Sequence, residues 1–415
     1  MRSRRGWISL VALASAGCGA SPSGAPSAEP SAHEQGAIAG GTLDTDDAAV
    51  FQEFTQFSQS ASACTASLIA PNVLLTARHC ISQGGSENIV CGRSPFGDPV
   101  AGSDTVVTNA TQPSDRSTFY RGADVRVPSD GSDVCGFDVA LIILASPVPA
   151  SQATPLVPRI DIPVVAGEAY TAVGYGLNDD GERNPGRMQR GDLAVTCLPD
   201  QCPRLGVAPT EFLGDTGVCS GDSGGPALDT EGKVIGVVSR GSEPCATPIY
   251  GQVAAWADFI TKTVLNAAET GGYAPPFWAL SGSSTLDPTL AQSGQACADT
   301  SECTPGTACY YASDPSHAVC TPVCANDRQC GSGKQCVTGY DVALGGLCIA
   351  QPGTTSDTAA PASSATSTGN EDRADESCAL SPGRHGSPTS GWLLVVAGLA
   401  AVLRTRSKRA LSPQS

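Results

Sequence analysis

Three short segments of the chain each hold one residue of the kind that nucleophilic catalysis uses. His79 lies within the segment TARHC, Asp138 begins the segment DVAL, and Ser223 lies within GDSGGP. A serine hydroxyl becomes a good nucleophile only when a base takes its proton, and that base needs an acid to orient it. We therefore predict acyl transfer at Ser223. His79 would be the general base, and Asp138 would fix its tautomer and stabilise the imidazolium.

The glycines beside the serine predict a tight turn. Such a turn can aim the backbone N–H groups of Gly221 and Ser223 at a developing oxyanion. Each segment taken alone has a simpler interpretation. A lone histidine is often structural, an aspartate before an apolar strand is usually a cap or turn residue, and GDSGG could be an ordinary loop. Each of the three residues lies within a longer motif, and the occurrence of all three motifs in one chain favours catalysis over coincidence.

Short β-like runs must position these residues between Ile38 and about residue 268. The runs are separated by Gly and Pro, and examples are 66–69, 73–75, 139–144, 169–173 and 234–239. An amphipathic helical pattern follows at 253–265. Many short strands without alternating helices predict an antiparallel barrel or sandwich with one terminal helix.

The composition agrees with a secreted, β-rich protein. Of 415 residues only 15% are charged, whereas Gly (47) and Pro (31) are abundant, which disfavours a helical bundle. A formal charge of −16 argues against a nucleic-acid partner. Eighteen cysteines indicate an oxidising compartment. No His-x3-His or Glu-His cluster is present, so we expect no metal and no other cofactor.

The three segments resemble the signature segments of the chymotrypsin-like (trypsin-family) serine endopeptidases, and the resemblance covers 38–268. It implies two six-stranded antiparallel β-barrels with the active site in the cleft between them. Arg78 departs from the family's usual alanine, and Thr65 and Ala66 replace a usual Gly-Gly, but neither departure touches proton transfer directly. The resemblance also implies four disulfides: Cys64–Cys80, Cys219–Cys245, Cys91–Cys135 and Cys197–Cys202.

The sequence Ile-Ala-Gly-Gly at 38–41 is similar to the mature N-terminus of that family. The resemblance implies that cleavage after Ala37 frees an ammonium group on Ile38, which inserts and pairs with Asp222. An ordinary glycine turn is the alternative. Because Ala37 is neither Arg nor Lys, a trypsin-like activator is disfavoured.

The resemblance also places the primary specificity pocket. Gly217, six residues before the serine, would lie at its base, and Ser239 and Gly241 would lie in its wall. Asp215 could supply a charge only if the loop shifts its register, and Arg240 replaces a usual aromatic residue. An uncharged pocket favours small or apolar side chains, because burying Lys or Arg unpaired would be costly.

A cysteine-rich repeat at 294–350 follows a predicted Gly/Pro/Ser linker at 269–293. Each copy has four cysteines with matching spacing, and their connectivity stays open. The cysteines of the two copies are Cys297, Cys303, Cys309 and Cys320, then Cys324, Cys330, Cys336 and Cys348. Units this small need covalent support, so we expect disulfides. Zinc is the alternative, but the paired CxxC knuckles of structural zinc sites are absent.

Both ends of the chain indicate export and attachment. Residues 1–17 resemble an export signal and 18–37 a disordered leader. Cys18 is interpreted as a lipidation site, with ordinary signal cleavage as the alternative. A Ser/Thr/Pro stalk at 351–390 contains Cys378, a second expected processing site.

The segment 391–409 combines a short apolar run with a basic cluster. Together with the cysteine before it, this segment resembles the C-terminal sorting tags of myxobacterial surface proteins. A buried C-terminal helix is the alternative.

The sequence thus predicts an all-β protease domain with a C-terminal helix, a small disulfide-rich module and a short apolar C-terminal helix. We expect a monomeric serine endopeptidase that cuts protein or peptide substrates after small or apolar residues. It would be secreted or held at a bacterial outer membrane or cell surface by lipid, by the C-terminal tag or by both. An inactive homologue acting in surface binding or adhesion is the alternative function.

Overall fold

A computed structural model describes eight stretches of the chain, interrupted by short gaps. They are 38, 40–84, 89–114, 116–177, 186–202, 205–242, 245–312 and 317–351. The expected signal, leader, stalk and sorting tag, with Cys18, Ala37 and Cys378, lie outside the described residues. Among the described helices, none has both the length and the hydropathy needed to cross a membrane.

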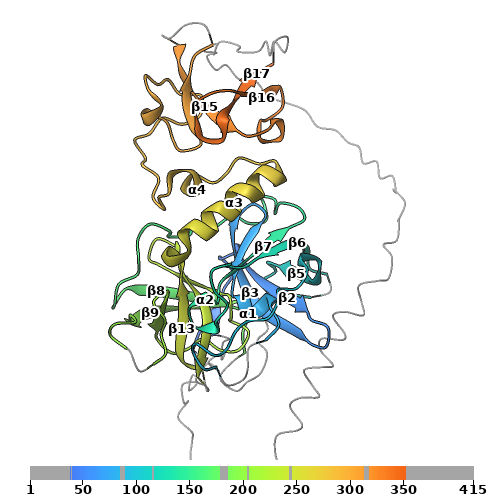
Figure 1. Cartoon of the computed structure of the whole chain (residues 1–415), viewed down its shortest axis with the longest axis vertical. Coiled ribbons are helices and arrows are strands. Elements are labelled where there is room, and N and C mark those ends of the chain that lie inside the picture. The colour runs from blue at the N-terminus through green and yellow to red at the C-terminus, as the bar shows by residue number, and fades with distance from the viewer. Residues whose placement is uncertain are drawn as a thin grey trace, which may run out of the picture. The chain divides into compact units, whose positions relative to one another are not determined.

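The first barrel, drawn in blue to teal in Figure 1, is a closed, six-stranded antiparallel sheet. Its strand order is β2-β3-β4-β7-β6-β5. Its interior is aliphatic, with Leu68, Leu74 and Leu141 fully buried. The strands are β2 (Val50–Gln56), β3 (Ala61–Ala70), β4 (Val73–Thr76), β5 (Thr105–Thr108), β6 (Tyr120–Arg126) and β7 (Ala140–Leu144). A short 3-10 turn, η1 (Gly102–Asp104), leads into β5. Closure removes the free sheet edges and gives the loops between strands fixed ends.

The second barrel is built from the sheet β1-β9-β10-β13-β12-β11-β8, and a further pairing of β8 with β9 closes six of these strands into a ring. An aromatic cluster fills its core, in which Phe212 stacks on Tyr250 at 5.0 Å between ring centroids. The strands are β1 (Thr42–Leu43), β8 (Ala169–Gly174), β9 (Met188–Cys197), β10 (Glu211–Gly214), β11 (Pro226–Leu228), β12 (Val234–Ser242) and β13 (Ala246–Gln252). The structure therefore has the two six-stranded antiparallel barrels that the family resemblance implies.

A terminal helix follows the second barrel, as expected. After the turn η2 (Val253–Trp256), α3 (Ala257–Gly271) buries Ile260 and Val264 against the first barrel's core and ends at Gly272. The next stretch, predicted as a linker at 269–293, contains a further helix, α4 (Phe277–Ser281). Its Trp278 is only 1% exposed and belongs to the same core cluster. The Gly and Pro content of this stretch indicated a linker, although the stretch contains a packed helix.

The cysteine-rich region forms a four-stranded sheet with the order β14-β15-β17-β16. Its elements are η3 (Thr300–Glu302), β14 (Thr307–Tyr310), β15 (Val319–Cys324), η5 (Asp327–Gln329), β16 (Lys334–Thr338), η6 (Ala343–Gly345) and β17 (Gly346–Ala350). In each repeat the first cysteine pairs with the third and the second with the fourth. The bonds are Cys297–Cys309, Cys303–Cys320, Cys324–Cys336 and Cys330–Cys348. Because the sulfurs bond to one another, these cysteines are not available as zinc ligands.

Candidate active site

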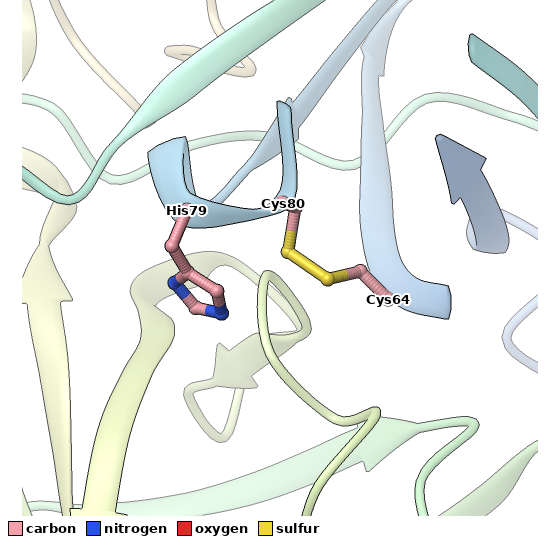
Figure 2. Close-up of side chains that lie close together, drawn as sticks. All are labelled: Cys64, His79 and Cys80. Atoms are coloured by element: carbon pink, nitrogen blue, oxygen red, sulfur yellow. A yellow bond between two sulfur atoms is a disulfide. The ribbon is translucent and has the colours of Figure 1, made fainter. Parts of the chain in front are cut away.

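His79 lies on a single helical turn, α1 (Arg78–Ile81), directly after β4. The neighbouring Cys80 is bonded to Cys64 of β3, which ties this turn to the barrel wall. Figure 2 shows the imidazole and this disulfide side by side below the turn. The His79 side chain is 28% exposed, so it can meet a substrate while its backbone stays fixed.

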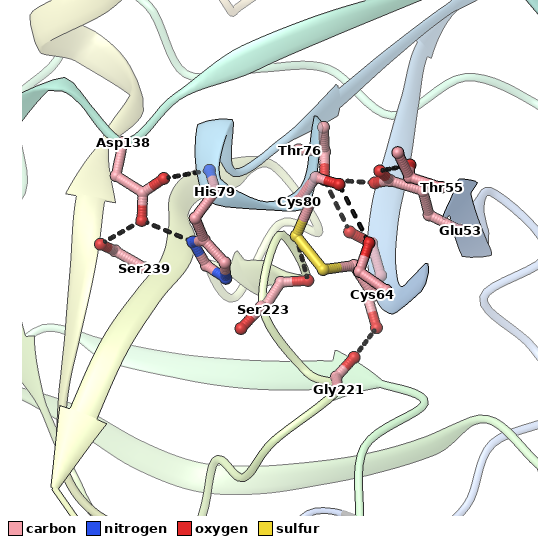
Figure 3. The surroundings of a disulfide bond; sticks show 12 residues. Glu53, Thr55, Cys64, Thr76, His79, Cys80, Asp138, Gly221, Ser223 and Ser239 are labelled. Atoms are coloured by element: carbon pink, nitrogen blue, oxygen red, sulfur yellow. Dashed lines mark hydrogen bonds and ion pairs between the residues drawn. A yellow bond between two sulfur atoms is a disulfide. The ribbon is translucent and has the colours of Figure 1, made fainter. Parts of the chain in front are cut away.

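Asp138 ends the irregular turn α2 (Val134–Phe137) and precedes β7. Its Oδ1 accepts from the His79 backbone nitrogen at 2.9 Å, and its Oδ2 lies 2.8 Å from His79 Nδ1 (Figure 3). The Ser239 hydroxyl donates to the same Oδ2 at 2.6 Å. The carboxylate is 1% exposed and has three donors. This double attachment orients the ring so that Nε2 faces away from the acid.

The electrostatics of the pair favour a proton on the imidazole. Burial by itself lowers the pKa of His79, but the charge and hydrogen bond of Asp138 together with the charge of Glu53 raise it by more, and the net pKa lies above its usual 6.5. Burial by itself raises the pKa of Asp138, but the His79 charge and the hydrogen bonds lower it by more, so its net pKa falls below 3.8. His79 can therefore accept a proton beside a carboxylate that stays ionised.

Ser223 lies in the loop before β11, and several contacts hold this loop against the first barrel. Its carbonyl accepts from Thr65 N at 2.8 Å, and Cys80 Sγ lies 3.7 Å from the same oxygen. Gly224 has φ +82°, and a Cβ there would lie 2.2 Å from Thr65 O, so only glycine fits. Figure 3 shows Ser223 beside the His79 ring. In the described part of the chain no hydrogen bond joins the two side chains, a contact that often tightens only when substrate binds.

The turn before the serine has free backbone donors. Gly221 has φ +100°, and within the described residues the N–H groups of Gly221 and Ser223 have no acceptor. Between them, the buried Asp222 accepts from Gly176 N at 2.8 Å and from Cys219 N at 2.9 Å. Burial raises the pKa of Asp222 to about 7, and no cation among the described residues pairs with it. Two unpaired N–H groups beside a nucleophile are suited to stabilise an oxyanion.

Comparison with protein-family models assigns a family to the domain that contains this site. Residues 38–260 match the family model described as Trypsin. The chain belongs to the trypsin family. A trypsin from Saccharopolyspora erythraea is 30% identical over 215 residues, which cover 48% of this chain and 86% of the relative. Brachyurin from Leptuca pugilator is 31% identical over 187 residues, which cover 43% of this chain and 76% of the relative.

Family membership makes the chain a serine-type endopeptidase, a hydrolase of peptide bonds. The disulfides Cys64–Cys80, Cys91–Cys135, Cys197–Cys202 and Cys219–Cys245 join the same four pairs that the resemblance implies. Disulfides of this number suit an oxidising, extracellular environment.

The segments expected to form the specificity pocket of this trypsin-family domain lie close together. Gly217 N donates to Cys245 O at 3.1 Å. A Cβ on Gly241 would lie 3.5 Å from Pro248 Cα, so β12 and β13 approach each other at this point. The Asp215 carboxylate accepts from Ala194 N at 2.8 Å in β9, and this bond gives it a structural role. Ser239 is expected in the pocket wall, and its hydroxyl donates to the Asp138 carboxylate at 2.6 Å.

Arg240 and Glu211 form an ion pair that sequence reasoning missed. The guanidinium donates to both carboxylate oxygens, at 2.5 and 2.7 Å, and Glu211 is only 1% exposed. Glu211 also accepts from Gly136 N at 2.7 Å, two residues before Asp138. The pair therefore supports the loop that carries the acid. An arginine at a usual aromatic position was the only signal in the sequence, since nothing local marks Glu211.

Arg78 is the other position at which an arginine replaces the family's usual residue. Its guanidinium makes its contacts away from the reacting groups. It donates to Gly131 O at 2.9 Å, and its guanidinium carbon lies 5.0 Å from the centre of the Phe96 ring. These contacts anchor the loop that follows β6. The substitution of alanine by arginine therefore leaves the His79 ring undisturbed.

Proposed function

We propose that the chain is an active, exported endopeptidase that acts through the triad His79, Asp138 and Ser223. The observation that carries the proposal is the double attachment of His79 to a buried carboxylate, at 2.9 Å through its backbone nitrogen and 2.8 Å through Nδ1. An imidazole held in this way presents Nε2 as the proton acceptor for a neighbouring hydroxyl.

In the proposed reaction, Ser223 Oγ attacks the scissile carbonyl carbon while His79 Nε2 takes the hydroxyl proton. The N–H groups of Gly221 and Ser223 stabilise the resulting oxyanion. The imidazolium then gives its proton to the leaving amine, the C–N bond breaks, and an ester on Ser223 remains. Water attacks this ester and passes a proton to His79. The acid product leaves, and the proton returns to Ser223.

The rival function, an inactive homologue serving as a binding protein, is tested by turnover. Replacing Ser223 with alanine should lower peptide hydrolysis by roughly four to six orders of magnitude if the triad acts as a unit. The exposed Ser220, in the segment just before Ser223, offers a matched control, because Ser220→Ala removes a serine hydroxyl that lies outside the triad. Equal turnover in Ser223→Ala and the unsubstituted protein would overturn the proposal.

We propose a preference for small or apolar residues before the cut. The residue expected at the pocket base is Gly217, the Asp215 carboxylate bonds to β9, and Pro248 lies close to Gly241. An arginine or lysine side chain would find no counter-charge from these residues. A panel of peptides that differ only at the residue before the cut tests this, and a strong preference for arginine would refute it.

We also propose that cleavage after Ala37 activates the enzyme. In support, the Ile38 side chain is 0% exposed within the core of the second barrel, and the buried Asp222 has no cationic partner among the described residues. A new ammonium group on Ile38 would supply one. Alanine itself suits the proposed pocket, so one molecule could activate another. A Ser223→Ala precursor that still matures when expressed alone would count against self-activation.

The proposed location is the cell surface. The basis for it is the export signal at 1–17, lipidation or processing at Cys18 and Cys378, and the sorting tag at 391–409. These features are supported by sequence alone. Cleavage after Ala37 would separate the enzyme from Cys18 and leave retention to the C-terminal tag. A form truncated after Ala350 should therefore yield soluble mature enzyme, and continued membrane retention would contradict the proposal.

A further inference from the structure

One residue of the first barrel holds both ends of the turn that carries Ser223. Thr65 follows Cys64 in β3 and is 0% exposed. Its backbone N–H donates to Ser223 O at 2.8 Å, and its hydroxyl donates to Gly221 O at 2.9 Å. The same hydroxyl accepts from Tyr175 N at 3.1 Å, just after β8. Thr65 therefore links the first barrel to two segments of the second.

The chemistry of the partners fixes the direction of these bonds. A backbone carbonyl can only accept, and a backbone N–H can only donate. The single hydroxyl proton of Thr65 therefore points at Gly221 O, and a lone pair faces Tyr175 N. An apolar side chain of the same shape would leave one backbone donor and one acceptor without these bonds.

The turn needs such contacts because it is rich in glycine. Gly221, Gly224 and Gly225 can each adopt several backbone conformations with similar ease, and two of them have positive φ. An oxyanion hole works only when its N–H groups are already aimed at one point. The resemblance to the trypsin family leads us to expect glycine at position 65, which could supply the backbone bond but no hydroxyl.

We propose that Thr65 is a positioning residue for the oxyanion hole. Its hydroxyl holds the Gly221 carbonyl, and this contact keeps the N–H groups of Gly221 and Ser223 convergent. Thr65 touches no reacting atom and acts through the backbone of the turn. The inference rests on the proposed function, since it assigns a role within the same site.

The test uses variants of the full chain that separate the hydroxyl from the methyl group. Thr65→Ser and Thr65→Ala differ by one oxygen atom, and Thr65→Val keeps the shape of threonine. A control is Thr108→Ala, which removes another buried hydroxyl of the first barrel, one that accepts from Ala110 N at 3.3 Å. For each variant we would measure kcat and KM on a peptide. We would also measure the rate at which a fluorophosphonate labels Ser223 in chains that begin at Ile38.

The expected result is a loss in kcat with little change in KM. Thr65→Ala should fall roughly tenfold to a hundredfold below Thr65→Ser in kcat, and Thr65→Val should behave like Thr65→Ala. KM should stay within about twofold, because the lost contact acts on the oxyanion and not on substrate affinity. The labelling rate should fall in parallel with kcat. The control should lower thermal stability while kcat stays within about twofold.

Two results would overturn the inference while the enzyme remains active. One is a kcat for Thr65→Ala within twofold of Thr65→Ser, and the other is an effect carried by KM alone. If Thr65→Ala does not fold, the comparison of Thr65→Val with Thr65→Ser decides by the same criteria. An unsubstituted mature chain that neither cleaves peptides nor reacts at Ser223 would instead overturn the proposed function, and this inference with it.

Discussion

Replacing Asp138 with asparagine should force His79 into a tautomer that cannot act as a base. The His79 backbone N–H lies 2.9 Å from Asp138 Oδ1 and can only donate, so the amide oxygen of the variant must face it. The amide nitrogen then occupies the place of Oδ2, 2.8 Å from His79 Nδ1. There it donates to Nδ1, which puts the ring proton on Nε2, the atom that must accept from Ser223.

The size of the loss follows from the contacts. Restoring the active tautomer would break one hydrogen bond and set two buried donors against each other, at a cost of about 2–4 kcal/mol. Losing the charged acceptor for the imidazolium removes about 1.5–3 kcal/mol more. At about 1.4 kcal/mol for each factor of ten, kcat should fall by roughly two and a half to five orders of magnitude.

The pH profile supplies a second readout. Only the neutral imidazole can act as a base, so activity is lost as the pH falls through the pKa of His79. In the unsubstituted enzyme that pKa is raised above 6.5, because the Asp138 charge and hydrogen bond, with the charge of Glu53, outweigh burial. Without the charge, burial remains and lowers the pKa. The acidic limb of kcat/KM should therefore move to lower pH in Asp138→Asn.

The assay is steady-state hydrolysis of a peptide substrate across the pH range. Asp133→Asn is a matched control, since Asp133 caps the start of α2, the turn that Asp138 ends, by accepting from Cys135 N at 3.0 Å. The reasoning is refuted if Asp138→Asn loses less than tenfold in kcat, or if its acidic limb moves to higher pH.

Three further predictions concern the groups around the triad. Ser239→Ala removes a 2.6 Å bond to the acid and should lower kcat about tenfold with KM unchanged, a split that steady-state kinetics would resolve. Burial raises the pKa of Glu53 to about 7, so its charge raises the pKa of His79 only near neutral pH and above. Glu53→Gln should therefore move the acidic limb of kcat/KM only slightly, to lower pH, in a pH–rate profile; an upward shift would contradict this. Gly224→Ala should destabilise the fold by at least about 2 kcal/mol in denaturant unfolding, because its Cβ would lie 2.2 Å from Thr65 O at φ +82°; normal stability would show that the turn can rearrange.

The sequence predicted those features of the molecule that depend on a few neighbouring residues. The short β-like runs, the glycine turn at Ser223 and the terminal helix each follow from composition and periodicity over a few residues. The small size of the units and the absence of paired CxxC knuckles favoured disulfides over zinc in the C-terminal repeat, where the structure places four bonds. Their connectivity could not be predicted, because spacing alone permits several pairings.

The contacts that sequence could not predict join distant segments. Glu211 and Arg240 lie 29 residues apart, and the Thr65 hydroxyl bonds to a carbonyl 156 residues away. Local sequence does not identify such partners, since they depend on how distant segments meet in the folded domain. Trp278 was missed for a related reason. The stretch around it is rich in Gly, Pro and Ser, yet the tryptophan itself is buried in the core.

The most direct test of the central claim is the labelling of the mature protein with a serine-directed fluorophosphonate, followed by peptide mass spectrometry across the pH range. The account predicts one adduct, on Ser223, whose rate of formation falls as His79 becomes protonated and collapses in His79→Ala. A folded mature chain with no adduct on Ser223, or one labelled equally fast in His79→Ala, would contradict the account.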